Sequence, residues 1–221
     1  MEPKISGVGV LDKSFGVVAL VAESPRTLAE LIQGTGLSRA TAHRLALALE
    51  AHGLLRRLTD GRFALGLHLV ALGRIAAEQF PLAEIAQPAL VALREITGES
   101  VQLYVRDGSN RVCIAALESL HGLRTIVAVG AALPLEVGSA GRVLSGEPTA
   151  TGWLQTVGER EAGVASVSAP VRGPQVELLA AVSVSGPIDR LGRSPGKLHG
   201  PAVVAAAKQI QQALESAPFL T

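Results

Sequence analysis

Two groups of side chains have the types and spacing that could do chemistry. The first lies within residues 34–65, where small and basic residues open a predicted helix and arginines follow in a predicted hairpin. Arginine can bind a guanine edge or a phosphate, and small side chains let a helix enter the major groove. The pattern predicts contacts to double-stranded DNA from Ser38, Arg39, Thr41, His43, Arg44, Arg56, Arg57 and Arg62.

Arg44 is expected to contribute most, either at a guanine edge or on a phosphate. Ser38 and Thr41 would reach a phosphate or a thymine methyl, and the hairpin arginines would contact the backbone beside the groove. Residues 34–66 carry five basic and two acidic side chains, which favours phosphate contact. The alternatives are an ordinary solvated helix face, or a surface that docks onto a partner protein.

The second group consists of hydroxyl side chains. Ser139 lies in Gly138-Ser139-Ala140-Gly141 and opens a short predicted helix, whose free N–H groups attract anions; the alternative is an ordinary N-cap, which the spacing alone favours. Ser183 and Ser185 point to the same face of one predicted strand. If that face is buried, both hydroxyls need partners from the protein or from a ligand; otherwise they face water.

The remaining residue patterns do not favour an enzyme. The five histidines lack metal-ligand spacing, and the Ser139 motif lacks the G-x-S-x-G spacing of a nucleophile elbow. Cys113 lies in the middle of a predicted strand, where a small buried residue is expected. We expect no catalysis, no cofactor and no metal; an enzyme that uses the Ser139 region is the rival, but it lacks a base.

Composition narrows the class of protein further. The chain has 221 residues and 3% aromatic residues, so its cores should be aliphatic. Cys113 is the only cysteine, which excludes an intrachain disulfide and fits a reducing compartment. Neither a signal pattern nor an apolar run of membrane length is present. We expect a cytoplasmic protein without a membrane partner.

The first predicted group sits on a helix with one apolar face. Ala42, Leu45, Ala46 and Leu49 recur at helical spacing, with Ser38 as the N-cap. Helices are also predicted at 10–21 and from the capping box at residue 27 to residue 35, and a hairpin turns at residues 59–61. Together these elements predict a winged helix-turn-helix over residues 1–66.

The rest of the chain predicts a linker helix and a second domain. A helix at 67–80 has an apolar stripe without a partner in the first domain, so subunit contact is expected. Residues 81–221 then predict antiparallel strands between flanking helices, an α+β arrangement. The predicted helices are 82–97, with a kink or a later start at Pro88, 139–144 and 201–214, the last starting at Pro201; the predicted strands are 100–105, 111–117, 125–129, 164–170 and 178–185.

The residues resemble the IclR family of bacterial transcription regulators over nearly the whole chain. The N-terminal matching pieces are Gly7–Lys13, Leu28–Leu31, Thr35–Leu45 and Asp60–Gly66. The C-terminal ones are Leu133–Leu135, Gly138–Gly141, Ala169–Val171 and Val182–Pro187. Gly158–Glu161 and Gly163–Ser168 look most like an actinobacterial branch that controls the biosynthesis of amino acids, including leucine.

The resemblance implies a winged helix-turn-helix domain, a linker helix and a GAF-like effector-binding domain. It also implies a homodimer or a dimer of dimers, and a small-molecule effector such as an amino acid or a carboxylate. The positions that match the family's ligand-lining residues are Leu123, Leu133, Ser139, Ala140, Ser166, Ser183 and Ser185.

One departure from the family pattern affects this expectation. The family usually has about two dozen further residues, mostly helical, where residues 146–151 form the whole connection here, so the effector domain is shortened. Thr156 stands near the place where an acidic ligand contact is common. The expected function is a DNA-binding regulator gated by a metabolite; the alternatives are an effector-insensitive regulator and a protein-interaction module.

Overall fold

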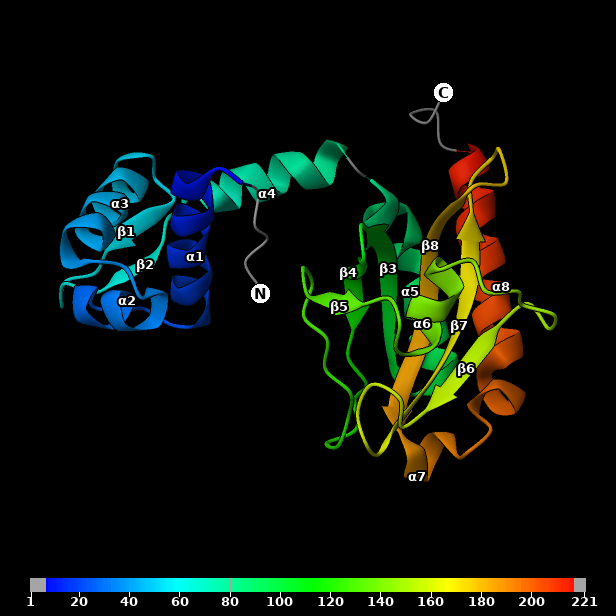
Figure 1. The fold of residues 1–221 in the computed structure, drawn as a ribbon. Coiled ribbons are helices and arrows are strands. Elements are labelled where there is room, and N and C mark those ends of the chain that lie inside the picture. The colour runs from blue at the N-terminus through cyan, green and yellow to red at the C-terminus, as the bar shows by residue number, and fades with distance from the viewer. Residues whose placement is uncertain (1–6, 80, 217–221) are drawn as a thin grey trace. The chain divides into compact units, whose positions relative to one another are not determined.

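Helix α3 (Arg39–Ala51) is held from behind by the apolar face that the sequence predicts. In the computed structural model, which describes residues 7–79 and 81–216, its positions Ala42, Leu45, Ala46 and Leu49 are buried. They face α1 (Gly9–Glu23) and α2 (Leu28–Thr35), and the core of this unit includes Val17 and Leu31. Figure 1 shows these three helices grouped around the small ribbon β1–β2.

The turn between α2 and α3 follows from local chemistry. Thr27 and Glu30 form a complete capping box at the start of α2, as predicted. Gly36 ends that helix with φ of 67°, a left-handed conformation that glycine adopts without steric cost. Ser38 then caps α3 by accepting the N–H of Thr41 at 3.3 Å. Two capped ends therefore hold the turn between the helices.

The predicted hairpin is present and is tied to the helices. Strands β1 (Leu55–Arg57) and β2 (Phe63–Leu65) pair antiparallel, with Leu55 opposite Leu65. Arg26 and Phe63 exchange backbone hydrogen bonds of 2.9 and 2.7 Å, which adds an isolated bridge to the ribbon. The Phe63 ring is buried in the helical core, so the ribbon and the helices share one core.

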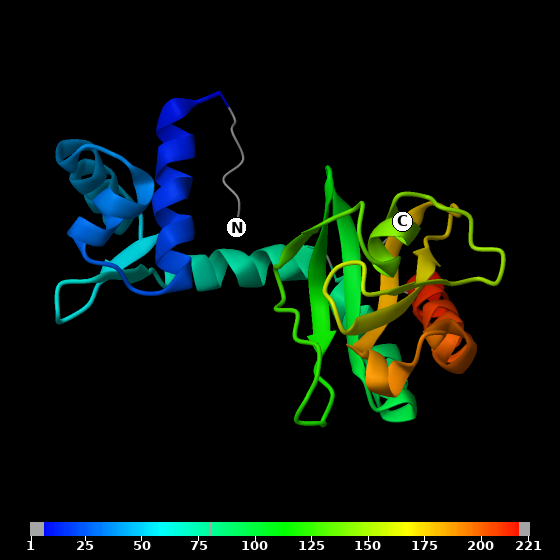
Figure 2. The same cartoon turned by 60° about the horizontal axis from the view of Figure 1, so that its bottom comes forward.

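Helix α4 (His68–Gln79) has the exposed apolar side chains that the sequence predicts. Val70 is 70% exposed, Leu72 and Ile75 are exposed as well, and so is Leu67, which directly precedes the helix. Figure 2 shows α4 leaving the group of α1, α2 and α3. Of the described helices, none combines the length and the apolar content that crossing a membrane requires.

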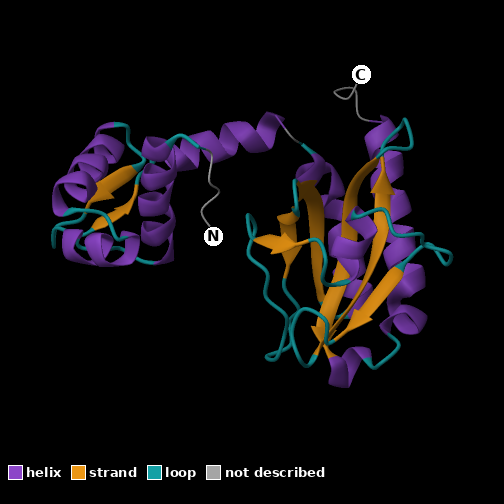
Figure 3. Cartoon of the chain, in the orientation of Figure 1, coloured by secondary structure: helices purple, strands orange, loops and turns teal. Residues whose placement is uncertain are grey.

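The chain divides into two units, Met1–Phe80 and Pro81–Thr221, and the second is built on one antiparallel sheet. Figure 3 distinguishes the mainly helical first unit from this sheet. The strand order is β5-β4-β3-β8-β7-β6. The strands are β3 (Ser100–Asp107), β4 (Asn110–Leu117), β5 (Ala132–Pro134), β6 (Leu154–Val157), β7 (Val164–Arg172) and β8 (Leu178–Pro187).

Helices cover both faces of this sheet, with different side chains on each face. Helices α5 (Leu82–Thr97) and α8 (Pro195–Ser216) pack on one face, and α6 (Ser139–Leu144) packs on the other. Alternation along the strands assigns Val167 and Val184 to the first face, in the core with α5 and α8. The neighbouring Ser168 and Ser183 consequently point to the α6 side.

One predicted strand assignment needs correction, and some short elements were not predicted. Residues 125–129 form no strand; instead β5 pairs with the outer edge of β4, with Arg111 opposite Leu133. That edge can accept only one partner segment, and it is occupied by β5 and by the Cys113–Ala131 backbone bond. Strand β6 and the short helix α7 (Ile188–Leu191) were not predicted.

Proline positions account for the other differences. Helix α5 has the predicted bounds and continues through Pro88, so of the two alternatives at this proline the later start is wrong. Helix α8 begins at Pro195 and contains Pro201 in its interior, so the helix starts six residues earlier than predicted. Gln155 accepts the N–H of Gly196 at 2.8 Å, which satisfies a backbone donor in the first turn of α8. A proline does stand at the start of this helix, as predicted, but it is Pro195 and not Pro201.

Replacement of Leu31 by alanine should destabilise the first unit by about 2–5 kcal/mol, because the side chain is fully buried and a cavity would remain. Hydrogen exchange of peptides from α1, α2 and α3 measures this locally. Leu47→Ala is the matched control, since Leu47 is 42% exposed on α3 and its loss should change stability by less than about 0.5 kcal/mol. Equal effects of both changes would contradict the described core.

Candidate nucleic-acid interface and effector recess

The outer face of α3 is exposed at its N-terminal end. Ala40, His43 and Arg44 are exposed. A shallow, open hollow lies beside them, lined by Arg39, Ala40 and His43 of α3 and by Leu28 of α2. Among the described residues, neither Arg39 nor Arg44 has an ion pair or a side-chain hydrogen bond. Both guanidinium groups are therefore available to a base edge or a phosphate.

The arginines of the ribbon are already engaged by their own chain. Arg62 forms an ion pair of 2.7 Å with Asp60, and this hydrogen-bonded carboxylate raises the pKa of Arg62. Arg57 lies over the Phe63 ring at 4.4 Å and is 3.7 Å from Glu50. These contacts fix the two side chains and reduce the net positive charge that the ribbon presents.

The two hydroxyl groups at the start of α3 have different capacity for further bonds. Ser38 accepts from the Thr41 backbone and donates to Thr41 Oγ1 at 3.0 Å, so its proton is used. Thr41 accepts that bond and keeps its own proton. Thr41 can therefore donate to a phosphate, whereas Ser38 mainly positions the helix.

The second unit contains a small recess between α6 and the sheet. Its cavity volume is about 20 Å³, which is room for about one water molecule. It contains two arginines, one tyrosine and several hydroxyl groups, and no acidic residue lines it. The lining residues are Tyr104, Arg111, Gly138, Ser139, Ala140, Thr156, Arg160, Val164, Ser166, Ser183 and Ser185.

Five hydroxyl groups on this side of the sheet form one hydrogen-bonded chain. Thr156 and Ser166 are 3.0 Å apart, Ser166 and Ser139 2.8 Å, and Ser139 and Ser168 2.7 Å. Ser168 donates to Ser183 at 2.9 Å. The strand alternation places these hydroxyls here, so Ser183 faces the interior and not water.

Proton counting gives this chain of hydroxyls a direction, because each hydroxyl donates once. Ser168 donates to Ser183, so its bond to Ser139 must be donated by Ser139. By the same reasoning Ser166 donates to Ser139, and Thr156 donates to Ser166. The proton of Ser183 is thus left over at the end of the chain, beside the recess.

Arg111 is a buried cation without a carboxylate partner among the described residues. It is 3% exposed, and its Nη1 donates to the carbonyls of Pro134 and, at 2.7 Å, Val137. Its buried Nε has no partner in the described part of the chain. Burial lowers the pKa of Arg111. The prediction missed this residue, although its alternation with Cys113 on one face of β4 signals a buried charge.

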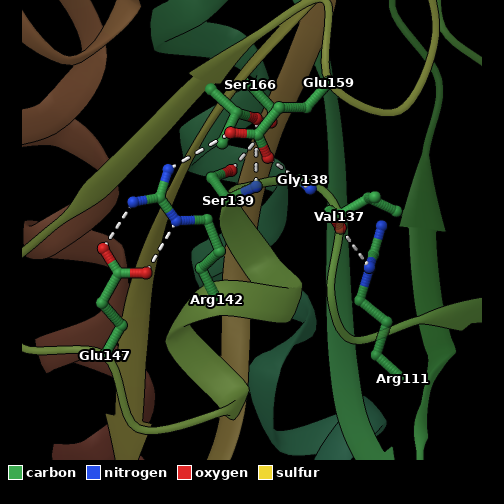
Figure 4. Close-up of polar contacts among 9 residues, drawn as sticks. Arg111, Val137, Gly138, Ser139, Arg142, Glu147, Glu159 and Ser166 are labelled. Atoms are coloured by element: carbon green, nitrogen blue, oxygen red, sulfur yellow. Dashed lines mark hydrogen bonds and ion pairs between the residues drawn. The ribbon is translucent and has the colours of Figure 1, made fainter.

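A carboxylate of the chain lies at the edge of the recess. Glu159 accepts the Gly138 N–H at 2.9 Å and is paired with Arg142 at 3.2 Å. Figure 4 shows Glu159 above the start of α6, with Arg142 held between Glu159 and Glu147. The neighbouring Ser139 N–H donates to Thr156 Oγ1 at 3.1 Å. Both backbone donors are therefore satisfied from within the chain.

The structure brings most of the predicted effector positions together. Ser139, Ala140, Ser166, Ser183 and Ser185 all line the recess, and Ser185 also donates to Gln102 at 3.0 Å.

Two of the predicted effector positions lie elsewhere. Leu123 is 69% exposed, with its carbonyl bonded to Arg190, and Leu133 packs beside the cluster that contains Cys113.

Within residues 7–79 and 81–216, no group of three histidine, cysteine, aspartate or glutamate residues is placed to hold a metal.

The only tyrosine in the chain gives a direct optical test of the recess. Burial raises the pKa of Tyr104 to about 12, against the positive charges of Arg111 and Arg160. The folded state holds this proton more tightly than the unfolded chain, whose pKa is about 10. The resulting stabilisation is complete below pH 10 and is lost as the pH rises to about 12.

Ultraviolet titration of the phenolate should accordingly show a midpoint near pH 12 in the folded protein and near pH 10 in urea. Circular dichroism at each pH checks that the chain is still folded. A midpoint near 10 before unfolding would show that the ring is accessible to water.

Comparison with known proteins identifies both units. Residues 10–59 match the IclR helix-turn-helix domain, and residues 74–151 and 146–212 match the C-terminal domain of bacterial IclR transcriptional regulators. The second match consists of two pieces that meet at the short connection after α6. The sequence departs from the family at the same place.

Individual relatives agree with these matches. KipR of Bacillus subtilis strain 168 is 32% identical over 131 residues, which cover 59% of this chain and 52% of KipR. The repressor IclR of Escherichia coli strain K12 is 26% identical over 248 residues, covering 94% and 90% of the two chains. An IclR homolog of Microbacterium hydrocarbonoxydans, complexed with 4-hydroxybenzoate, superimposes with a TM-score of 0.80 at 20% identity, covering 94% and 100%.

The two family domains occur in the same order as the two units of the structure, and the relatives are transcriptional regulators and not enzymes. The chain therefore belongs to the IclR family of DNA-binding bacterial transcriptional regulators.

Proposed function

We propose that the start of α3 and the β1–β2 ribbon bind operator DNA, and that a small carboxylate in the recess changes the affinity for that operator. The observation that carries the second part is the composition of the recess. Its polar side chains are arginines, a tyrosine and hydroxyls, with no acid among the lining residues. Such a site favours a ligand that accepts hydrogen bonds and carries negative charge.

For the DNA contact, the availability of each side chain sets its proposed role. Arg44 and Arg39 have no competing partner among the described residues, so they would read bases or bind phosphate. His43 and Thr41 would support them from the same end of α3. Ser38 would keep the helix start in register, and the ribbon arginines 56, 57 and 62 would contact the DNA backbone.

For the effector, Ser183 and Arg111 supply the chemistry. Ser183 has a proton left over, and Arg111 has charge without a carboxylate partner in the described part of the chain. A carboxylate could accept from the first and neutralise the second. The complex of the Microbacterium relative contains 4-hydroxybenzoate, which is a carboxylate, and this supports the ligand class. Leu123 and Leu133 would contribute only after a movement of their segments.

Coupling between the two units requires a second copy of the chain. The exposed apolar residues of α4, and Leu11 and Phe15 of α1, would be covered in a homodimer or a dimer of dimers. The effector would favour one arrangement of the second units, and α4 would pass this preference to the spacing of the two α3 helices.

The proposed biological setting is the control of a biosynthetic pathway. The resemblance of residues 158–168 to a branch that controls amino-acid biosynthesis, including that of leucine, favours such a pathway. A regulator of bacterial DNA would act in the cytoplasm.

An effector-insensitive regulator is the second candidate. Two observations favour it: the recess has room for about one water, whereas ligand pockets usually have several hundred Å³, and the connection at 146–151 is short. In this case the second unit would serve only in assembly.

Arg44→Ala should weaken operator binding by about 1–3 kcal/mol, or roughly 5- to 150-fold, because a contact to a base edge or phosphate is lost. The operator is first recovered by capturing genomic fragments on the protein, and fluorescence anisotropy then gives the affinity. Arg106→Ala, an exposed arginine in the second unit, is the control and should bind like wild type.

The salt dependence of the same measurement separates DNA binding from a protein-interaction module. Phosphate contact requires affinity to fall steeply with salt as counterions are released. Unchanged operator binding by Arg44→Ala would contradict the proposed docking.

Titration with 4-hydroxybenzoate and smaller carboxylates should shift the operator affinity of wild type. Ser183→Ala should raise the carboxylate concentration needed by roughly 10- to 100-fold, because a hydrogen bond to a charged group is removed. Ser109→Ala, in an exposed turn, is the control. If no carboxylate changes operator affinity, the effector-insensitive alternative replaces the proposal.

A further inference from the structure

We propose that Glu159 is a competitor built into the chain, whose carboxylate holds the edge of the recess until an anionic effector displaces it. The inference rests on the proposed function, because it concerns the same recess. In this proposal Glu159 determines which effectors bind, because only a negatively charged ligand can replace its carboxylate.

The first observation is the position of the carboxylate. One oxygen of Glu159 accepts the N–H of Gly138, which lines the recess, and the other is 3.2 Å from Arg142. These are the two kinds of contact, a backbone N–H and a guanidinium, that a free carboxylate would make. At the edge of the recess, the Glu159 side chain therefore makes the contacts that a ligand carboxylate would make (Figure 4).

The second observation is that the interior remains short of negative charge. Arg111 is buried, its Nε has no partner in the described part of the chain, and Glu159 does not reach it. Arg160 lines the recess as well, and its ion pair with Glu161 is long, at 3.7 Å. A buried cation that, among the described residues, is contacted only by carbonyls and by the Tyr104 ring at 5.4 Å is costly, so a second carboxylate that reached Arg111 would gain more than Glu159 does at the edge.

The third observation is the available space. A cavity of about 20 Å³ admits about one water molecule, so a small carboxylate can enter only if residues at the edge of the recess move. Glu159 holds that edge through the Gly138 N–H, so the proposal couples its departure to the entry of the ligand. A neutral ligand would leave the Gly138 N–H without a charged acceptor and Arg142 with Glu147 as its remaining carboxylate, which disfavours neutral molecules.

The fourth observation is that Glu159 can leave at small cost. Its side chain is 37% exposed, and exposed ion pairs contribute little to stability. It lies on the turn that Gly158 and Gly163 flank, both at positive φ. Arg142 would keep its two contacts to Glu147, so α6 stays anchored during the exchange.

Hydrogen exchange of the full chain, without any effector, tests the inference. In Glu159→Ala the amide of Gly138 should exchange about tenfold faster than in wild type, because it loses its acceptor, whereas the Ser139 amide keeps its bond to Thr156. Acetate, which supplies the missing carboxylate as a separate molecule, should restore protection in this variant. Acetamide, the neutral molecule of similar shape, should not restore it, and wild type should respond to neither.

Two further variants make the comparison specific. Glu161→Ala removes a neighbouring acid of the same turn. In this variant the amides at the start of α6 should exchange as they do in wild type. Glu159→Gln keeps the size of the side chain and replaces the alanine variant if circular dichroism shows that the alanine variant is unfolded. Exchange of the Gly138 amide should also be faster in Glu159→Gln than in wild type, and acetate should slow it.

Each outcome decides the proposal. Unchanged exchange in Glu159→Ala, rescue by acetamide as well as acetate, or equal acetate protection in wild type would overturn it. None of these results uses DNA, so they are separate from the operator titration. An operator that ignores all carboxylates would remove the effector function, while rescue by acetate alone would still establish that Glu159 holds a carboxylate site.

Discussion

The alternation of β7 and β8 is the constraint on which the second unit depends. Every second residue, such as Val167 and Val184, belongs to the core under α5 and α8, and the residues between them carry hydroxyls toward α6. A register shift of one residue would exchange the two faces, burying serines in the aliphatic core and exposing valines to the recess. The apolar core and the recess are thus specified by the same strand pairing, in which Ser168 lies opposite Ser183.

Burying several hydroxyls is tolerable only because they satisfy one another. A buried hydroxyl without a partner costs about 1–3 kcal/mol, whereas a bonded one is close to neutral. The chain from Thr156 to Ser183 meets this condition at each step but the last, where one proton remains. That excess of donors, added to the charge of Arg111, is the basis of the anionic effector that we propose.

Features set by nearby residues could be predicted, and those set by remote pairing could not. The capping box of α2, the cap at Ser38 and the buried face of α3 all depend on residues within a few positions. By contrast, Glu159 and Gly138 are 21 positions apart, and no local pattern brings them together. The strand prediction at 125–129 is wrong for the same reason, because β-propensity does not determine which segment pairs with the edge of β4.

The short connection after α6 can be explained by the same charges that surround the recess. Its first residues include Glu147, which binds Arg142 through both carboxylate oxygens. Arg142 also binds Glu159, so one guanidinium ties α6 to the connection before β6 and to the turn after it. Here a planar fork with two acidic partners anchors these segments. Because such an anchor is polar and partly exposed, one of its partners can be exchanged for a ligand without dismantling the unit.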